Sequence, residues 1–164
     1  RVSEIAKKYK KKFYINVQGD EIFVNPISIR KVIKQMKKAT YKVVNCYTKI
    51  KDAKEFYSLS VPKTIISKKN HLMYMSRSPV PGSKKNLFVK GKKQVCIYGF
   101  KRDILLRFYS SSQKKTENEK IEDIEIIRLL ENNIPIYMIE VTGSKLAIDT
   151  LEDFIKAKKI FKIR

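Results

Sequence analysis

The stretch FYINVQGDEIF, residues 13–23, contains the first strand pattern of the sequence and the acids that follow it. Its first part, Phe13–Val17, is rich in aromatic and β-branched residues and predicts a buried strand. The strand stops at an amide, a glycine and two adjacent acids, residues 18–21. Acids are scarce in this chain, which has 37 Lys and Arg against 16 Asp and Glu. Two acids side by side at a strand end therefore need an explanation.

The bulk composition is that of one globular domain. The chain has 164 residues, of which 43% are hydrophobic, enough for a real core. No window approaches the roughly 18 consecutive apolar residues of a membrane span, and residues 1–5 do not resemble a signal peptide. Cys46 and Cys96 lie far apart in apolar runs, which is typical of reduced thiols. We therefore expect a cytoplasmic protein with no membrane partner.

The charge is strongly unbalanced, with a formal net charge of +21. Such an excess is typical of proteins that bind nucleic acids, anionic membranes or anionic small substrates. The lysines, however, are spread along the whole chain, and the densest run is Lys7–Lys12. We interpret them as a solvated basic surface and predict no nucleic-acid partner. A nonenzymatic basic protein stays an alternative, because aromatic residues interleave with lysines in residues 7–14.

Strand and helix patterns alternate along the chain, which predicts an α/β layered sheet with helices on both faces. The expected strands are 13–17, 41–47, 64–67, 71–75, 94–100 and 136–141. The expected helices cover 2–11, 26–36, 52–57, the region of 104–108, a single helix with Ile121–Leu130 on its buried side, and a last helix capped by Thr150. With five glycines, the chain contains no GxGxxG or Walker motif.

Two acids lie where an α/β sheet binds ligands, beyond the carboxyl ends of strands. Asp20 follows Gly19, which allows a sharp turn, and Asp149 precedes the last helix. Carboxylates together with substrate phosphates are the ligands that Mg²⁺ prefers. The residues alone leave two interpretations open, a two-carboxylate metal site or acids that favour helix N-termini. Glu21 is interpreted as a solvated or capping acid.

Five motifs occur in the order of a known family: VQGDE (17–21), YMSRSPVP (74–81), IYGF (97–100), IEDIEIIRLL (121–130) and IDTLEDF (148–154). This pattern resembles the 3-deoxy-manno-octulosonate (Kdo) cytidylyltransferases. The resemblance implies a nucleotide-diphospho-sugar transferase fold, in which the hydroxyl of a 3-deoxy-ulosonic acid attacks the α-phosphate of CTP and pyrophosphate leaves. It also implies Mg²⁺ as cofactor, a homodimer, and a role in lipopolysaccharide or surface-glycan synthesis.

The matched motifs assign roles to single residues. By resemblance, Asp20 and Asp149 are the catalytic aspartates that hold the metal, and the substrate-binding residues are Gln18, Gly19, Arg77, Gln94, Tyr98 and Glu125. Gln94 stands where the family has a histidine, and Ile126 where it has a glutamine. These two departures keep another sugar acid, 8-amino-Kdo or a sialic-type acid, as an alternative substrate.

The loop with which this family begins, and which holds CTP, has no counterpart in this sequence. The resemblance therefore implies that residues 1–164 are the C-terminal two-thirds of a single cytidylyltransferase domain, an N-terminally incomplete form of the fold. We expect the isolated chain to be inactive. An inactive basic fragment or partner protein is the remaining alternative.

Overall fold

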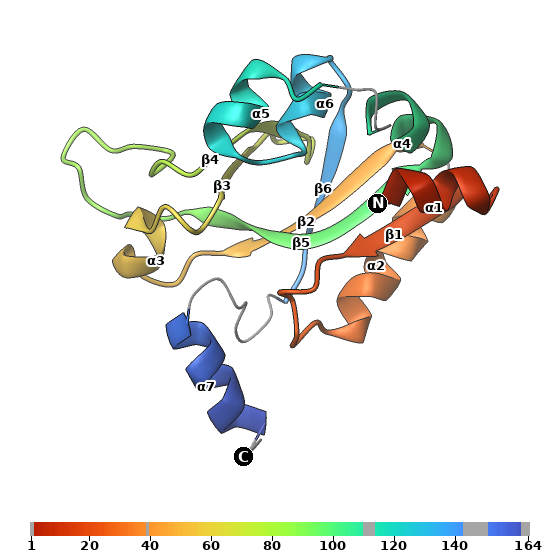
Figure 1. Cartoon of the computed structure of the whole chain (residues 1–164). Coiled ribbons are helices and arrows are strands. Elements are labelled where there is room, and N and C mark those ends of the chain that lie inside the picture. The colour runs from red at the N-terminus through yellow and green to blue at the C-terminus, as the bar shows by residue number, and fades with distance from the viewer. Residues whose placement is uncertain (1, 39, 110–113, 143–150, 162–164) are drawn as a thin grey trace.

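The computed structural model describes residues 2–38, 40–109, 114–142 and 151–161. Six strands form one mixed sheet (Figure 1): β1 Phe13–Val17, β2 Val43–Lys49, β3 Lys63–Ile66, β4 Leu72–Ser76, β5 Lys92–Lys101 and β6 Ile136–Glu140. The helices are α1 Val2–Lys8, α2 Pro26–Lys37, α3 Ala53–Tyr57, α4 Arg102–Phe108, α5 Glu117–Glu122, α6 Ile127–Glu131 and α7 Leu151–Phe161. The expected α/β class is confirmed.

The ten-residue strand β5 organises the sheet, whose order is β4-β3-β5-β2-β6 with β1 also paired to β5. One edge of β5 is covered along most of its length by antiparallel β2. The other edge is shared, because β1 pairs with residues 97–101 and β3 meets β5 only where Lys63 lies opposite Lys93. Residues 94–96 of this edge therefore lie between the ends of two strands.

Helices cover both faces of the sheet, as the sequence predicts (Figure 1). On one face α2 buries Val32 and Met36. It packs so closely that a Cβ added at Gly99 would lie 2.6 Å from the Met36 side chain. On the other face the larger core holds side chains of α1, α4 and α6, including Ala6 and Ile127.

The predicted helix over 121–130 is wrong in one respect, because it is divided. Asp123 adopts a left-handed conformation with φ 49° and ends α5, and α6 starts again at Ile127. The turn leaves Ile121 74% exposed, although its spacing predicted a buried position. A periodicity count assumes an unbroken helix, so it cannot place residues on either side of such a turn.

A buried ion pair holds the two short helices together. Arg128 donates from Nε and Nη2 to the Glu119 carboxylate, both at 2.7 Å, and from Nη1 to the Phe108 carbonyl at 2.6 Å. Glu119 also closes the capping box of α5 with Thr116. Bidentate pairs of this kind are geometrically specific. They fix the turn between α5 and α6, which carries residues 123–125, against α4.

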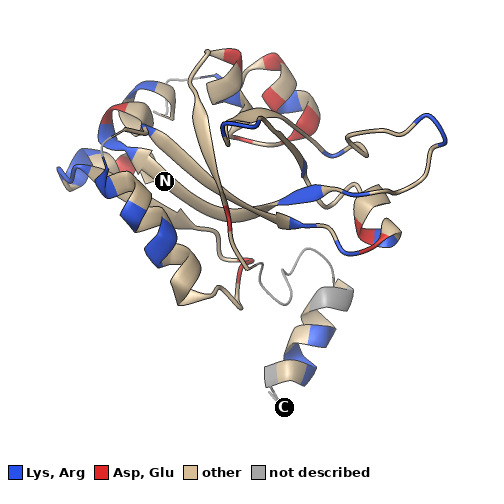
Figure 2. Cartoon of the chain, turned by 180° about the vertical axis from the view of Figure 1, so that it is seen from behind, with Lys and Arg blue, Asp and Glu red and all other residues tan. Residues whose placement is uncertain are grey.

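Basic side chains occur on elements at opposite ends of the molecule, including α1, α2 and α7 (Figure 2). The less numerous acids are most frequent in and around α5 and α6. Within the described ranges, no helix is both long and apolar enough to cross a membrane.

Candidate functional site

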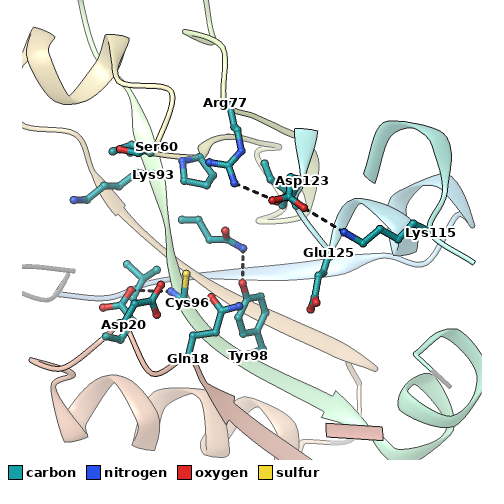
Figure 3. A pocket seen from close by; sticks show the side chains of 16 residues that line it. Gln18, Asp20, Ser60, Arg77, Lys93, Cys96, Tyr98, Lys115, Asp123 and Glu125 are labelled. Carbon is teal, nitrogen blue, oxygen red and sulfur yellow. Dashed lines mark hydrogen bonds and ion pairs between the residues drawn. The ribbon is translucent and has the colours of Figure 1, made fainter. Parts of the chain in front are cut away.

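A pocket of about 480 Å³ opens at the uncovered part of the β5 edge (Figure 3). Its walls come from five segments: the turn after β1, the loop before β3, the residue after β4, the middle of β5, and the region around the turn between α5 and α6. The pocket exists because β1 ends at Val17 and β3 starts only opposite Lys93, so no strand covers β5 between them.

The pocket brings together six residues that the sequence singled out. They are Gln18, Asp20, Arg77, Gln94, Tyr98 and Glu125. Gly19 is exposed in the turn and does not line the pocket, and Asp149 lies outside the described residues. Sequence reasoning missed Ser60, Lys93 and Lys115, which also line it. No local signal could have found the two lysines in so lysine-rich a chain.

Glu21 is not the solvated or capping acid that we expected. Its side chain is only 6% exposed, and its Oε1 accepts a hydrogen bond from the Cys96 backbone N–H at 3.0 Å. Just beside it, the Gln18 N–H donates to the Cys96 carbonyl at 3.1 Å, which is the last rung of the β1–β5 ladder. Glu21 therefore satisfies a backbone donor at the point where the strand partner ends.

Asp20, its neighbour, has the opposite environment. Its Oδ1 is buried and has no hydrogen-bond partner among the described residues. A buried carboxylate oxygen without a partner is costly, and a bound cation is one of the few groups that can compensate it. Asp20 thus has an open ligand position at the pocket wall (Figure 3). In the part of the chain that the structure describes, no group of three or more His, Cys, Asp or Glu side chains is arranged so that it could hold a metal ion.

Arg77 is held by backbone carbonyls. Its guanidinium donates from Nε to the Glu122 carbonyl at 2.6 Å, from Nη1 to that of Leu59 at 3.1 Å and from Nη2 to that of Asp123 at 3.2 Å. The Glu122 carboxylate accepts from the Arg77 backbone N–H at 2.8 Å. A guanidinium has five N–H groups, so two remain that can bind an anion in the pocket.

Gln94 is tied into the sheet on its donor side. Its Nε2 donates to the Asn45 side-chain oxygen at 3.2 Å and to the Tyr98 hydroxyl at 3.0 Å. Asn45 in turn donates to the carbonyls of Val95 and Ile97, where the β2–β5 register shifts. Both N–H groups of Gln94 are therefore used, and its carbonyl oxygen is the atom left to interact with a ligand.

Tyr98 keeps its proton over the whole working range of pH. Burial, with a smaller contribution from Cys96, raises the pKa of its phenol well above the ordinary value. Its oxygen accepts a hydrogen bond from Gln94, and its hydroxyl hydrogen can donate to Cys96 or to a ligand. Tyr98 is therefore a hydrogen-bond donor at the pocket wall (Figure 3).

Charged side chains of both signs complete the pocket. Lys93 pairs with Glu55 from α3, and Lys115 pairs with Asp123 at 3.2 Å. Glu125 lines the wall on the side of Asp123 and Lys115, across the pocket from Lys93 (Figure 3). Ile126, by contrast, is 2% exposed and packs in the larger core. The apolar residue at 126 therefore does not alter the pocket surface directly.

Known proteins with the same pattern are cytidylyltransferases. A family model described as Cytidylyltransferase matches residues 1–154. A 3-deoxy-manno-octulosonate cytidylyltransferase of Rickettsia canadensis is 35% identical over 151 residues, which are 92% of this chain and 59% of that protein. One from Trichlorobacter lovleyi is 30% identical over 174 residues, 99% of this chain and 68% of that protein.

The fold agrees with these sequence matches. A solved structure of CMP:2-keto-3-deoxy-manno-octonic acid synthetase complexed with CTP has a TM-score of 0.86 and 27% identity to this chain. The likeness covers 98% of this chain and 66% of that structure, so the chain spans about three-fifths to two-thirds of these relatives. The expected nucleotide-sugar transferase fold is confirmed. The chain belongs to the cytidylyltransferase family.

Proposed function

We propose that residues 1–164 form most of a cytidylyltransferase domain that couples CTP to a 3-deoxy-ulosonic acid, above all Kdo, and releases pyrophosphate. The CMP-sugar would serve lipopolysaccharide or surface-glycan synthesis. One observation carries the proposal: six residues matched to the family's site, spread from Gln18 to Glu125 in the sequence, line a single pocket. The names of the relatives and of the solved CTP complex support the same reaction.

The pocket has the groups that a sugar acid needs. The two remaining N–H groups of Arg77 suit a carboxylate, because a planar guanidinium can bind both carboxylate oxygens. The Gln94 carbonyl and the Glu125 carboxylate can accept hydrogen bonds from sugar hydroxyls, and the Tyr98 hydroxyl can donate one. Gln94 cannot carry a positive charge, so recognition of the sugar carboxylate depends mainly on Arg77. Binding in this pocket holds the acceptor hydroxyl in place and limits its motion.

Asp20 fits the role of a metal ligand. Its unpartnered buried oxygen lies at the pocket wall, and carboxylate oxygens are hard ligands of the kind that Mg²⁺ prefers. We propose Asp20 and Asp149 as the protein ligands; the role of Asp149 rests on the family resemblance. A bound Mg²⁺ would compensate phosphate charge during displacement.

We also propose that the protein is a homodimer. An apolar groove of about 480 Å³ lies between β3 and residues 88–92, and Val89 beside it is 74% exposed. A groove lined by apolar side chains, with an exposed valine at its rim, is a candidate surface for a second copy of the protein. Sedimentation of the wild type and of Val89→Asp over a range of concentrations tests this: a dimer that the variant abolishes is expected, and a wild-type monomer would contradict it.

The reaction is tested on the natural protein that contains residues 1–164. Pyrophosphate release from CTP is measured with Mg²⁺ and a panel of Kdo, 8-amino-Kdo and a sialic acid. We expect Kdo to have the highest kcat/KM. The 164-residue chain is assayed beside it and is expected to show no turnover, because it contains no counterpart of the family's CTP loop. Background rates with every sugar acid in the natural protein would refute the proposed function.

A further inference from the structure

A buried lysine lies directly behind the pocket. Lys63 is the first residue of β3 and is 0% exposed. Its ammonium donates to the carbonyls of Ser58 at 2.7 Å and Val61 at 2.8 Å, and also to that of Arg77. These contacts use all three N–H groups. Among the described residues, no carboxylate lies within ion-pair distance of this ammonium.

A buried charge without a direct counter-ion is a poor source of stability. Desolvation of an ammonium is costly, and hydrophobic residues of similar size often stabilise such positions better. Burial, together with the nearby Arg77 charge, lowers the pKa of Lys63, and the Glu122 carboxylate partly opposes this shift. The side chain is not needed for strand pairing, because the backbone of β3 pairs with β4 at Ser76, opposite Lys63.

The hydrogen bonds of Lys63 connect two walls of the pocket. Ser58 and Val61 belong to the loop that forms one pocket wall, and Arg77 forms another. The Arg77 side chain then binds the carbonyls of Leu59 and of the turn between α5 and α6. Lys63 therefore fixes the backbone of Arg77, while Arg77 fixes the third wall.

The charges around Arg77 also favour an anionic ligand in the pocket. The Glu122 carboxylate is engaged by the Ser76 hydroxyl at 2.6 Å and by the Arg77 backbone N–H. It makes no direct ion pair with the guanidinium in the described contacts, whose partners are all carbonyls. Two cations and one carboxylate are thus close together behind one wall of the pocket, which leaves one positive charge in excess, and an anion bound to Arg77 would compensate it.

We propose that Lys63 is a positioning residue for the acidic substrate: it holds Arg77 in the orientation that binds the substrate carboxylate and adds positive potential behind it. The inference rests on the proposed function, because the carboxylate is that of the sugar acid. It assigns Lys63 no contact with the substrate and no part in the chemical step. Its effect must therefore pass through Arg77.

The test uses Lys63→Met in the natural protein, with Lys54→Met at an exposed position of α3 as the matched control. We expect KM for Kdo to rise on the order of tenfold, the loss of about 1.4 kcal/mol of binding, with kcat and KM for CTP nearly unchanged. In an Arg77→Ala background, Lys63→Met should change KM for Kdo little further, since residues that act through one another are not additive. The control should behave as wild type in all assays.

Several results would overturn the proposal. A Lys63→Met enzyme with wild-type KM for Kdo contradicts it, and so do additive effects of the two substitutions or an equal loss of CTP binding. If Lys63→Met does not fold, the proposal can be tested by NMR of the wild-type protein with ¹⁵N-labelled lysine. The Lys63 ammonium signal should shift when Kdo is added, and the Lys54 signal should not. An unchanged Lys63 signal contradicts the proposal. A wild type without activity on any sugar acid refutes the proposed function instead.

Discussion

The carboxylate of Glu21 accepts a hydrogen bond from the backbone N–H of Cys96 at 3.0 Å, across 75 residues of sequence. This contact explains half of the acidic pair that ends β1. Glu21 replaces a missing strand partner at the edge of β5, whereas the adjacent Asp20 has a buried oxygen without a partner. One acid therefore supports the sheet, and the other remains available to a ligand.

Glu21→Ala should destabilise the fold by about 1–3 kcal/mol, because it removes the carboxylate that accepts the hydrogen bond of the partly buried Cys96 N–H. Glu21→Gln is the matched control, since its amide oxygen can still accept this bond. Urea unfolding of both variants measures the difference. Equal stability of the alanine and glutamine variants would show that the contact with Cys96 contributes nothing.

Asp20→Asn should lower kcat/KM on the order of a thousandfold while leaving the melting temperature almost unchanged. The amide keeps the shape of the carboxylate but loses the charge that a metal requires. Mn²⁺ binding followed by electron paramagnetic resonance gives a readout besides activity and should weaken in parallel. Asp103→Asn, at an exposed position of α4, serves as control. A near-normal rate at saturating Mg²⁺ would exclude Asp20 as a metal ligand.

Arg77→Ala should weaken sugar binding by roughly 2–5 kcal/mol, the range for removing one member of a desolvated, hydrogen-bonded charge pair. KM for CTP should hardly change. Arg77→Lys keeps the charge without the planar fork, so its KM for the sugar should lie between those of wild type and Arg77→Ala. Arg107→Ala, at an exposed position of α4, is the control. The assignment of the sugar pocket fails if Arg77→Ala raises KM for CTP and not for the sugar.

Gln94→His should lower the free energy of unfolding by about 1 kcal/mol at neutral pH. At low pH this loss should be smaller. A neutral imidazole has one N–H, whereas Gln94 donates to both Asn45 and Tyr98, and a protonated imidazole again has two donors. Unfolding is measured at pH 5 and pH 8. The same variant tests the choice of sugar. We expect Gln94→His to raise kcat/KM for Kdo only if the wild-type pocket binds Kdo poorly, and kcat/KM of both proteins is measured for each sugar acid of the panel.

Cys46 should make stability fall with rising pH. Burial raises the pKa of its thiol to about 12 from an ordinary value near 9, with Glu21 adding to the shift and Lys31 opposing it. Between these values the unfolded chain loses a proton that the folded protein keeps, so the free energy of unfolding decreases. Between pH 9 and pH 11 the wild type should therefore lose about 2 kcal/mol more stability than Cys46→Val, which has no thiol to titrate. Parallel pH profiles of the two proteins would contradict this.

The secondary-structure elements and the family pattern could be predicted from the amino-acid sequence. Apolar periodicity is a local property, so it predicted the strand at Phe13–Val17, the helix after Pro26 and the α/β alternation. The motifs around Gln18, Arg77 and Glu125 indicated residues that meet in one pocket. The broken helix at Asp123 escaped this reasoning, because a single left-handed residue leaves the apolar spacing almost unchanged.

The roles of the polar residues could not be predicted in this way, because they depend on contacts between distant segments. Whether Glu21 is solvated or buried depends on how far β1 and β3 cover β5, and that depends on strand register between distant segments. Lys63 is one lysine among many in the sequence, and its role follows from three carbonyls contributed by two segments. Hydrophobic patterns act over a few residues, whereas the partner of a buried polar group is set by the packing of the whole sheet.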